Sequence, residues 1–453
     1  MKQDFLMVDL IAKKRDGGEL SAAEIEFWLN GMLEGSIPDY QTSAMLMAIY
    51  YRGLSDRETR LLTDATLRSG EQLDLTEIEG VKADKHSTGG VGDKTSLIAM
   101  PLAAACGLKI VKMSGRSLGK TGGTADKLEA VCGFRLTLEP EELLRQAEDL
   151  GLVLISQSRN LTPADKRLYA LRDLTATVDS LPLIAASVMS KKLAAGAEVI
   201  VLDVKYGSGA FMPTAEDALS LADIMVKIGT AAGRRVSAVI SAMSAPLGLA
   251  VGNAVEVWEA AEVLQGRGVE DITGLSLALA AEQLYLAGLE KSRALAFARV
   301  KRALDEGEGY RLLLRFLQAQ GGDTSALEQG SFLTADYILS VYAEKDGRLA
   351  EMQADRIASA VQHLGAGRLK LEDKIDHQVG VIFKAQIGAE LQKGQEIALV
   401  YANDLAKGEQ AVREIAAACR IAEEAPEPRP QIFGLATAEG FIPWADLAAD
   451  YQL

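Results

Sequence analysis

The sequence predicts an α/β protein with a helical domain, a large α/β domain built on a mostly parallel sheet, and a smaller α+β C-terminal domain. Three observations lead to this prediction. Helical patterns fill the first seventy residues, short strand-like runs then alternate with helices, and the last hundred residues alternate like strands around glycines. At roughly 100–200 residues per domain, a chain of 453 residues has room for two or three domains.

The helical domain begins with residues 1–70. Capping boxes open two helices at Ser21 and Ser55, because each serine is followed three residues later by a glutamate that can return the backbone hydrogen bond. Residues 71–80 are polar and aperiodic, which indicates a hinge. A second helical stretch spans 162–193. Its pattern leaves open whether it joins the N-terminal helices in a discontinuous domain or belongs to the sheet region.

The α/β domain is expected over residues 80–155 and 197–343. Strand-like runs at 109–113, 198–204 and 234–240 alternate there with helical segments. This alternation predicts βαβ units and a mostly parallel sheet.

The C-terminal α+β domain is expected over residues 344–453. Runs at 380–385 and 396–401 alternate in hydrophobicity around Gly388 and Gly394. This pattern is typical of short strands joined by turns, and it differs from the helix-rich pattern that precedes it.

The charge balance argues against nucleic-acid and membrane partners. The chain carries 48 Lys and Arg against 63 Asp and Glu, a net charge of -15, whereas both partners need a basic face. No run is apolar enough to predict a membrane helix, and no secretory signal opens the sequence. The three cysteines are far apart and the histidines number only three, so we expect a cytoplasmic protein without disulfides or a zinc site.

Two glycine-rich segments, Lys85–Asp93 and Ser114–Asp126, predict phosphate binding. Glycines let several backbone N–H groups face one anion, while Ser, Thr and Lys side chains add donors and charge. Neither segment has the spacing of a standard nucleotide motif, and the alternative for each is a structural turn. His86 lies inside the first segment. We favour a ligand contact or proton role for it over a purely structural one.

The helical stretch at 162–193 presents a second group of polar residues on helical faces. Tyr169 and Arg172 are three residues apart, and Ile184, Ser187 and Lys191 follow at spacings of three and four. These faces suit a flat polar ligand. Spacing alone, however, favours the alternative of a solvated face with a salt bridge.

Four segments together resemble the thymidine and pyrimidine-nucleoside phosphorylase family. They occur in the family's order across nearly the whole chain, as KHSTGGVGDKTSL (85–97), SGRSLGKTGGTADKLE (114–129), YALRDLTATVDSLPLIAASVMSKKLAAG (169–196) and APLGLAVGNAVEVWEA (245–260). The resemblance implies a homodimer whose helical domain uses both 1–70 and 162–193. It also implies reversible phosphorolysis of pyrimidine nucleosides (uridine, thymidine and deoxyuridine) to a free base and an α-pentose 1-phosphate.

The same resemblance implies roles for individual residues. The phosphate ligands would be Lys85, Ser87, Ser96, Lys112, Ser114 and Thr124. The base would be bound by His86, Tyr169, Arg172, Ile184, Ser187 and Lys191. Among these, Arg172 and Lys191 would stabilise the departing base, and His86 would have the proton role, so we expect these three to be catalytic.

The resemblance further implies a bound potassium ion. Its positions here would be Gly92, Lys94, Leu247, Ala250 and Glu259. Lys94 departs from the family, in which a threonine can occupy this place. A lysine side chain has no lone pair for an ion when charged, and its ammonium would compete with the ion. The expected inorganic partners are therefore phosphate as co-substrate and potassium, with no organic cofactor.

Lys112 predicts a broad substrate range. Strict thymidine phosphorylases resemble one another in having methionine at this place, whereas members that accept ribonucleosides and deoxyribonucleosides have lysine. Lys120 and Tyr206 are further departures, where histidine and threonine are familiar. The alternatives are a strict thymidine phosphorylase, an anthranilate-type phosphoribosyltransferase, which would need magnesium, and a non-catalytic nucleoside or phosphate sensor.

Overall fold

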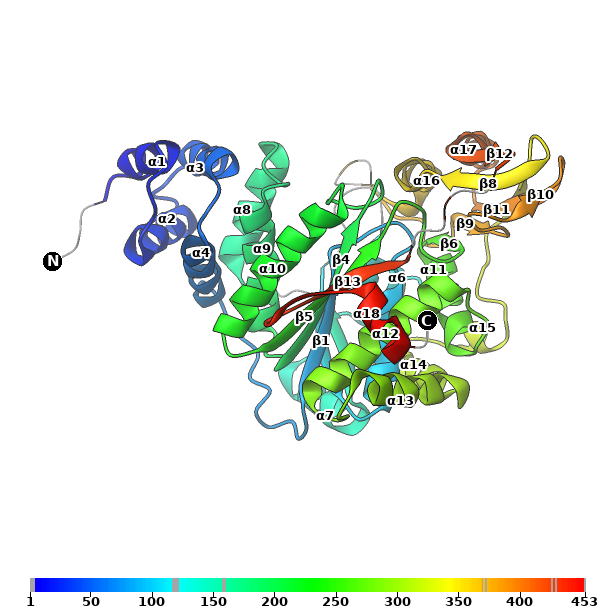
Figure 1. The fold of residues 1–453 in the computed structure, drawn as a ribbon, viewed down its shortest axis with the longest axis horizontal. Coiled ribbons are helices and arrows are strands. Elements are labelled where there is room, and N and C mark those ends of the chain that lie inside the picture. Colours follow the sequence, from blue (N-terminus) through cyan, green and yellow to red (C-terminus); the bar gives the residue numbers. More distant parts are fainter. Residues whose placement is uncertain are drawn as a thin grey trace.

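The computed structural model describes residues 5–115, 122–156, 160–368, 370, 373–424, 427 and 430–451. A helical bundle lies at one end of the molecule, the large sheet in the middle, and a small domain of short strands and two helices at the other end (Figure 1). This arrangement confirms the predicted fold class.

The bundle consists of four N-terminal helices and two later ones. These are α1 (Met7–Arg15), α2 (Ala22–Glu34), α3 (Asp39–Arg52), α4 (Asp56–Arg68), α8 (Pro163–Leu174) and α9 (Leu181–Ala194). Both predicted capping boxes are present, because Ser21 and Ser55 exchange hydrogen bonds with Glu24 and Glu58. Local sequence alone therefore sets where α2 and α4 begin.

Helix α9 belongs to two cores at once. Leu183 and Ala186 pack with the N-terminal helices, together with Leu168 of α8. On its other side, Met189 and Leu193 pack in the core formed by α10 (Ala215–Ala231) and the sheet. The helical stretch that interrupts the α/β pattern is thus the link between the bundle and the sheet.

The central sheet has seven strands in the order β14-β13-β5-β4-β1-β2-β3. Five of them run parallel: β1 (Lys82–Ser87), β2 (Lys109–Ser114), β3 (Leu152–Ser156), β4 (Val199–Tyr206) and β5 (Arg235–Ala242). The strands β13 (Ile432–Thr437) and β14 (Gly440–Pro443) extend it antiparallel. The remaining helices of the α/β region are α5 (Thr95–Ala105), α6 (Thr124–Leu128), α7 (Pro140–Leu150), α11 (Ala254–Leu264), α12 (Glu270–Ala287), α13 (Arg293–Asp305), α14 (Glu308–Ala319) and α15 (Ser325–Glu328).

The small domain contains two antiparallel sheets. One has the order β10-β8-β12 and the other β6-β9-β11-β7. Its elements are β6 (Ala250–Gly252), β7 (Tyr337–Tyr342), β8 (Gly347–Met352), α16 (Ala354–Val361), a π-helical turn (Gln362–Ala366), β9 (Gly380–Phe383), β10 (Glu390–Leu391), β11 (Glu396–Ala402), α17 (Leu405–Ala418) and β12 (Cys419–Ala422). Strand β6 comes from the α/β region, so that region and the small domain share a sheet.

The last elements of the chain do not belong to the small domain, although the sequence predicts one domain over residues 344–453. Strand β13 pairs with β5 of the central sheet, and α18 (Trp444–Tyr451) packs on α13. Tyr451 is buried there and donates a hydrogen bond to Glu282 at 2.8 Å. An isolated strand pattern does not specify its partner, because the pairing depends on which edge the fold leaves open.

None of the helices that the structure describes is long and apolar enough to cross a membrane.

Candidate functional site

The carboxyl ends of β1 and β2 bring the first glycine-rich segment beside the start of the second. The two strands are parallel neighbours, so Lys85, His86 and Ser87 leave the sheet at the same edge as Lys112 and Ser114. In parallel α/β sheets ligands bind at this edge. The structure therefore places five predicted site residues at the expected end of the sheet.

Two helix N-termini face the same region. Ser96 is in the first turn of α5, and Thr124 is the first residue of α6. Backbone N–H groups at a helix start have no partner within the helix and attract anions. Lys127 of α6 joins the two segments by donating to the Asp93 carbonyl at 2.6 Å.

Buried lysines and carboxylates, together with the partly buried Asp93, form what we call the strand-end network: Asp84, Lys85, Asp93, Lys112, Lys192, Asp203 and Lys205. The ion pairs within it are Lys85–Asp203 at 3.3 Å, Lys205–Asp203 at 2.8 Å, Lys192–Asp84 at 2.6 Å and Lys112–Asp84 at 3.4 Å. Four lysine amino groups thus face three carboxylates, and when all four are charged the excess of positive charge suits an anionic ligand.

The pKa values of Asp93 and Lys112 are both lowered, but by different causes. Burial alone would raise the pKa of Asp93, but the cations of Lys85, Lys205 and Lys127 hold it well below its usual range. Burial lowers the pKa of Lys112 to about 7, although the Asp84 carboxylate opposes this shift. Lys112 therefore changes charge near neutral pH, whereas Asp93 stays ionised.

His86 lies where the strand ends meet α9. Its side chain is half-buried, and burial together with the cations of Lys192, Lys112, Lys191 and Lys85 lowers its pKa well below 6.5. The imidazole is therefore neutral at physiological pH, and it can donate one ring N–H to a ligand.

Apart from His86 on β1, the residues predicted to bind the base lie on α8 and α9. Lys191 contacts Asp165 and the Ser187 hydroxyl, the latter at 2.9 Å. The Arg172 guanidinium lies over the Tyr169 ring, with its central carbon 5.6 Å from the ring centroid. Ile184 on α9 is half-buried.

Arg172 is more buried than a solvated helix face would allow, with 2% of its surface exposed. It donates to the carbonyls of Thr177, Val178 and Leu183, which lie in and after the loop between α8 and α9. These three contacts use three of its five N–H groups. Arg172 thus holds the loop as well as facing Tyr169.

Sequence reasoning missed several carboxylates and a lysine that position the site: Asp84, Asp165, Lys192 and Asp203. Lys192 connects α9 to both strands, because it pairs with Asp84 of β1 and donates to the Met113 carbonyl of β2 at 3.2 Å. The signal that could have found Asp203 is a charged residue within an apolar strand, VIVLDVKY.

The five predicted metal residues also converge, but a side chain fills the centre. The Lys94 ammonium donates to the Leu247 carbonyl at 2.8 Å, the Ala250 carbonyl at 3.0 Å and Glu259 Oε2 at 2.6 Å. The N–H of Lys94 itself bonds the Gly92 carbonyl at 2.9 Å. These groups do not fit a metal ion, because the positively charged Lys94 side chain already occupies the place between them.

Lys120 and Tyr206 are the two other residues that depart from the family resemblance, and the structure describes only Tyr206. Lys120 lies outside the described residues, as does the part of the second glycine-rich segment between residues 116 and 121. Tyr206 ends β4 and packs edge-on against Phe433 of β13, with 6.2 Å between ring centroids. Its ring therefore supports the strand that returns from the C-terminus.

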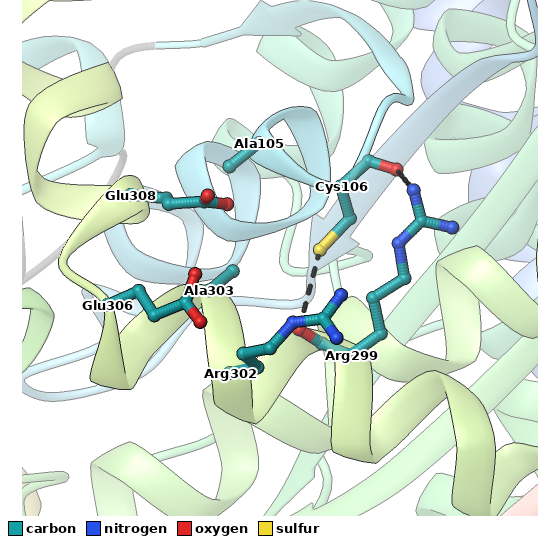
Figure 2. Close-up of a pocket in the computed structure, with 7 residues that line it drawn as sticks. All are labelled: Ala105, Cys106, Arg299, Arg302, Ala303, Glu306 and Glu308. Carbon is teal, nitrogen blue, oxygen red and sulfur yellow. Dashed lines mark hydrogen bonds between the residues drawn. The ribbon is translucent and has the colours of Figure 1, made fainter.

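A separate cavity of about 310 Å³ lies near the start of β2, away from these residues (Figure 2). It is lined by Ala105, Cys106, Arg299, Arg302, Ala303, Glu306 and Glu308. Burial raises the pKa of the Cys106 thiol to about 11, so the thiol stays protonated and is a poor nucleophile. This cavity contains none of the predicted site residues.

Comparison with known protein families places the fold and site in a defined class. Residues 8–70 match the glycosyl transferase family, helical bundle domain, and residues 79–310 match the a/b domain of that family. Residues 348–422 match the pyrimidine nucleoside phosphorylase C-terminal domain. The chain is therefore a glycosyl transferase of the helical-bundle and α/β type.

Individual relatives narrow the class. The chain is 49% identical over 424 residues to the pyrimidine-nucleoside phosphorylase of Bacillus subtilis (strain 168), covering 93% of this chain and 98% of that protein. It is 50% identical over 400 residues to that of Geobacillus stearothermophilus, covering 88% and 92%. The chain belongs to the pyrimidine-nucleoside phosphorylase family, which confirms the resemblance read from its motifs.

A solved structure shares part of the fold. The crystal structure of anthranilate phosphoribosyltransferase from Thermus thermophilus superimposes with a TM-score of 0.56 at 22% identity, covering 69% of this chain and 99% of that one. At this identity the likeness shows a shared fold and nothing about activity.

Proposed function

We propose that the protein catalyses the reversible phosphorolysis of uridine, thymidine and deoxyuridine. The products are the free pyrimidine base and α-D-ribose 1-phosphate or its 2-deoxy analogue. One observation carries the proposal: Lys192 joins α9, which presents Lys191, to the strand ends, which present the buried lysines. An anion subsite and a polar helix face are thereby held side by side.

The strand-end network and the neighbouring hydroxyls form the phosphate subsite in this proposal. Its ligands are Lys85, Ser87, Ser96, Lys112, Ser114 and Thr124. The helix starts at α5 and α6 add N–H groups with the correct polarity for an anion. Phosphate is the co-substrate, and no organic cofactor is required.

The helix pair forms the base subsite. Asp165 and Ser187 engage two of the three N–H groups of Lys191, which leaves one to donate to a base carbonyl. Arg172 has two N–H groups beyond its three backbone contacts, and Tyr169 and Ile184 border the base. The neutral His86 donates its ring N–H to the base oxygen nearest the sugar.

The reaction needs positioning and charge stabilisation rather than a protein nucleophile. A phosphate oxygen forms the new bond to C1′ of the sugar as the bond from C1′ to the base nitrogen breaks. The electron pair of that bond leaves on the base and spreads to its carbonyl oxygens, where Arg172 and Lys191 stabilise the charge. The base anion then takes up the proton that the attacking hydrogen phosphate loses, which gives the free base. Fixed donors aimed at developing charge are the main source of such catalysis.

Substrate range depends on Lys112 in this proposal. Its ammonium contacts the Lys85 carbonyl and the Asp84 carboxylate, at the end of β2 beside the phosphate subsite. A lysine here can hydrogen-bond a sugar 2′-hydroxyl or the phosphate, so ribonucleosides and deoxyribonucleosides are both substrates. A strict thymidine phosphorylase would not use the 2′-hydroxyl.

The deciding experiment separates the alternatives. The protein is incubated with phosphate and, in separate reactions, uridine, thymidine, deoxyuridine or cytidine, and free base and sugar 1-phosphate are measured. We expect release from the first three. Release from thymidine alone would overturn the argument from Lys112, and no release from any of them would overturn the function. Formation of a phosphoribosyl adduct from anthranilate and a pyrophosphorylated ribose would support the transferase instead.

We also propose a cytoplasmic homodimer in which 1–70 and 162–193 form the base-binding and dimerisation domain. The N-terminal helices and the residue before α1 expose large apolar and aromatic side chains, Leu6, Val8, Tyr40, Tyr50 and Tyr51. Exposed apolar side chains of this size suit contact with a second copy. The mass in solution by light scattering tests this. We expect twice the chain mass, and a monomer for Tyr51→Lys if this face is the interface.

A further inference from the structure

The place where the family resemblance puts a potassium ion is built here around Lys94. This residue directly precedes α5, and 1% of its surface is exposed. Its ammonium has three N–H donors and meets three acceptors: the Leu247 carbonyl, the Ala250 carbonyl and Glu259 Oε2. The distances, between 2.6 and 3.0 Å, are typical of charge-assisted hydrogen bonds. The ammonium is therefore fully satisfied without solvent.

Glu259 is fixed in turn by the backbone around it. Its two carboxylate oxygens accept N–H groups from Leu249 at 2.6 Å and Ala250 at 2.7 Å. A Cβ at Gly248 would lie 2.6 Å from Glu259 Oε1, so only glycine allows this approach. Likewise, a Cβ at Gly92 would lie 2.7 Å from the Leu247 carbonyl. The acceptors are thus held at fixed positions around one small cation.

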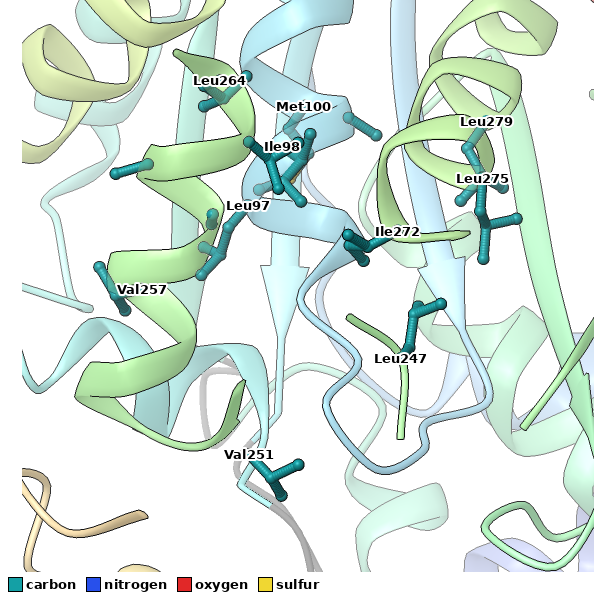
Figure 3. Packing of buried hydrophobic residues seen from close by; sticks show 14 of the residues in the cluster. Leu97, Ile98, Met100, Leu247, Val251, Val257, Leu264, Ile272, Leu275 and Leu279 are labelled. Carbon is teal, nitrogen blue, oxygen red and sulfur yellow. The ribbon is translucent and has the colours of Figure 1, made fainter. Parts of the chain in front are cut away.

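Apolar side chains pack next to the segments that carry these groups. Leu97 of α5, Val257 of α11, Leu247 and Val251 lie together in the main hydrophobic core (Figure 3). The Lys94 ammonium and its three acceptors form what we call the cage. A cation from solution could enter the cage only if the ammonium moved out, because two like charges so close together in a buried site repel strongly. If the ammonium moved out, only the Glu259 carboxylate and the Leu247 and Ala250 carbonyls would remain to bind the ion.

We propose that the Lys94 ammonium is a built-in replacement for the monovalent cation, so that the protein neither binds nor requires potassium at this place. The cage ties together segments that a bound ion would otherwise join. Leu247 donates to the Val91 carbonyl at 3.0 Å in the first glycine-rich segment, and Ala250 pairs with β9 of the small domain. The claim about cation binding rests on these contacts alone. The claim about turnover rests on the proposed function.

The unmodified protein gives the first test. Binding of radioactive rubidium, a potassium analogue, is measured by equilibrium dialysis. The melting temperature is then compared in potassium chloride and sodium chloride at equal ionic strength. We expect no stoichiometric rubidium and the same melting temperature in both salts. One rubidium per chain, or a higher melting temperature in potassium than in sodium, would overturn the proposal.

The substitution Lys94→Thr gives the second test, because it removes the ammonium and leaves a hydroxyl beside the same carbonyls and carboxylate. We expect this variant to bind one rubidium per chain and to melt at least about 3 °C higher in saturating potassium than in sodium, by mass action. Its turnover should depend on potassium. A folded Lys94→Thr variant that shows no preference for potassium would overturn the proposal.

Lys14→Thr is the matched control. Lys14 is also buried, but within the part of the chain that the structure describes its ammonium contacts only the two oxygens of Glu58, both at 2.8 Å. This variant should lose stability equally in both salts. If Lys94→Thr does not fold in either salt, the dialysis of the unmodified protein still decides. Absence of turnover in the unmodified protein, with the dialysis result as expected, would contradict only the proposed function.

Discussion

The strand-end network and the cage around Lys94 are both buried clusters of lysine and carboxylate, yet they are arranged for different purposes. In the cage, one ammonium meets three fixed acceptors. In the network, four lysine amino groups face three carboxylates, and Lys85 and Lys205 share Asp203. A lysine whose donors are all engaged stabilises the fold, whereas one that shares its acceptors can still receive an anion.

The two clusters meet at consecutive residues. Lys94 turns into the cage, whereas the hydroxyl of Thr95 contacts Lys85 and Asp93 in the network. The start of α5 is therefore held by a fixed cation on one side and open to an anion on the other. Substitutions of single lysines test this division.

Lys191→Ala is expected to have the largest effect on catalysis. It removes a charged donor from the departing base, and loss of such a donor costs about 2.7–4 kcal/mol, or roughly 10²–10³-fold in kcat/KM. Steady-state kinetics with uridine measure this effect. Lys166→Ala is the control, because Lys166 is exposed on α8. Near-normal kinetics in the Lys191 variant would contradict its role.

Lys94→Met is expected to affect stability strongly. It keeps most of the side-chain volume but leaves the Glu259 carboxylate buried without its cation, and breaking a buried pair in this way costs about 3–5 kcal/mol. The free energy of unfolding in urea measures the loss. A loss below about 1 kcal/mol would mean that the cage is less closed than its contacts indicate.

Lys112→Met is expected to change how stability depends on pH. The pKa of Lys112 falls from 10.5 in the unfolded chain to about 7 in the native one. Between these values the unfolded state binds more protons, so this residue makes the native state more stable as pH rises. The unmodified protein should therefore gain stability relative to the variant from pH 7 to pH 9. Urea midpoints that run parallel over this range would contradict the shift.

Lys227→Met is expected to have the smallest effect. Lys227 of α10 pairs with Asp56 at 3.2 Å and Asp223 at 2.7 Å, and all three side chains are at least half exposed. Exposed pairs contribute about 0–1 kcal/mol and are screened by salt. Urea unfolding should show little change. A loss as large as that of Lys94→Met would mean that burial does not explain the contrast between lysines.

Much of the architecture was predictable because its causes are local. The capping boxes at Ser21 and Ser55 involve residues three apart, and the alternation of strands and helices needs only hydrophobic periodicity. The glycine-rich segments and the faces carrying Tyr169 and Lys191 were also visible as short patterns. Their residues are close in sequence, so the pattern and the structure share the same spacing.

Other features were not predictable because they join distant residues. Strand β13 pairs with β5, nearly two hundred residues earlier, and no pattern within β13 specifies that edge. Lys192 pairs with Asp84 at a separation of 108 residues. Neither partner is distinguished from an ordinary surface charge until the fold buries both.

By itself, the sequence determined the class of fold, the segments that bind phosphate in the proposal, and the family. It also identified Lys94 as the residue that departs from the family. Only the tertiary structure decided where that ammonium points, because its acceptors at Leu247, Ala250 and Glu259 lie more than 150 residues away. A buried charge is stable only beside partners, and those partners are brought together by the packing of the whole domain.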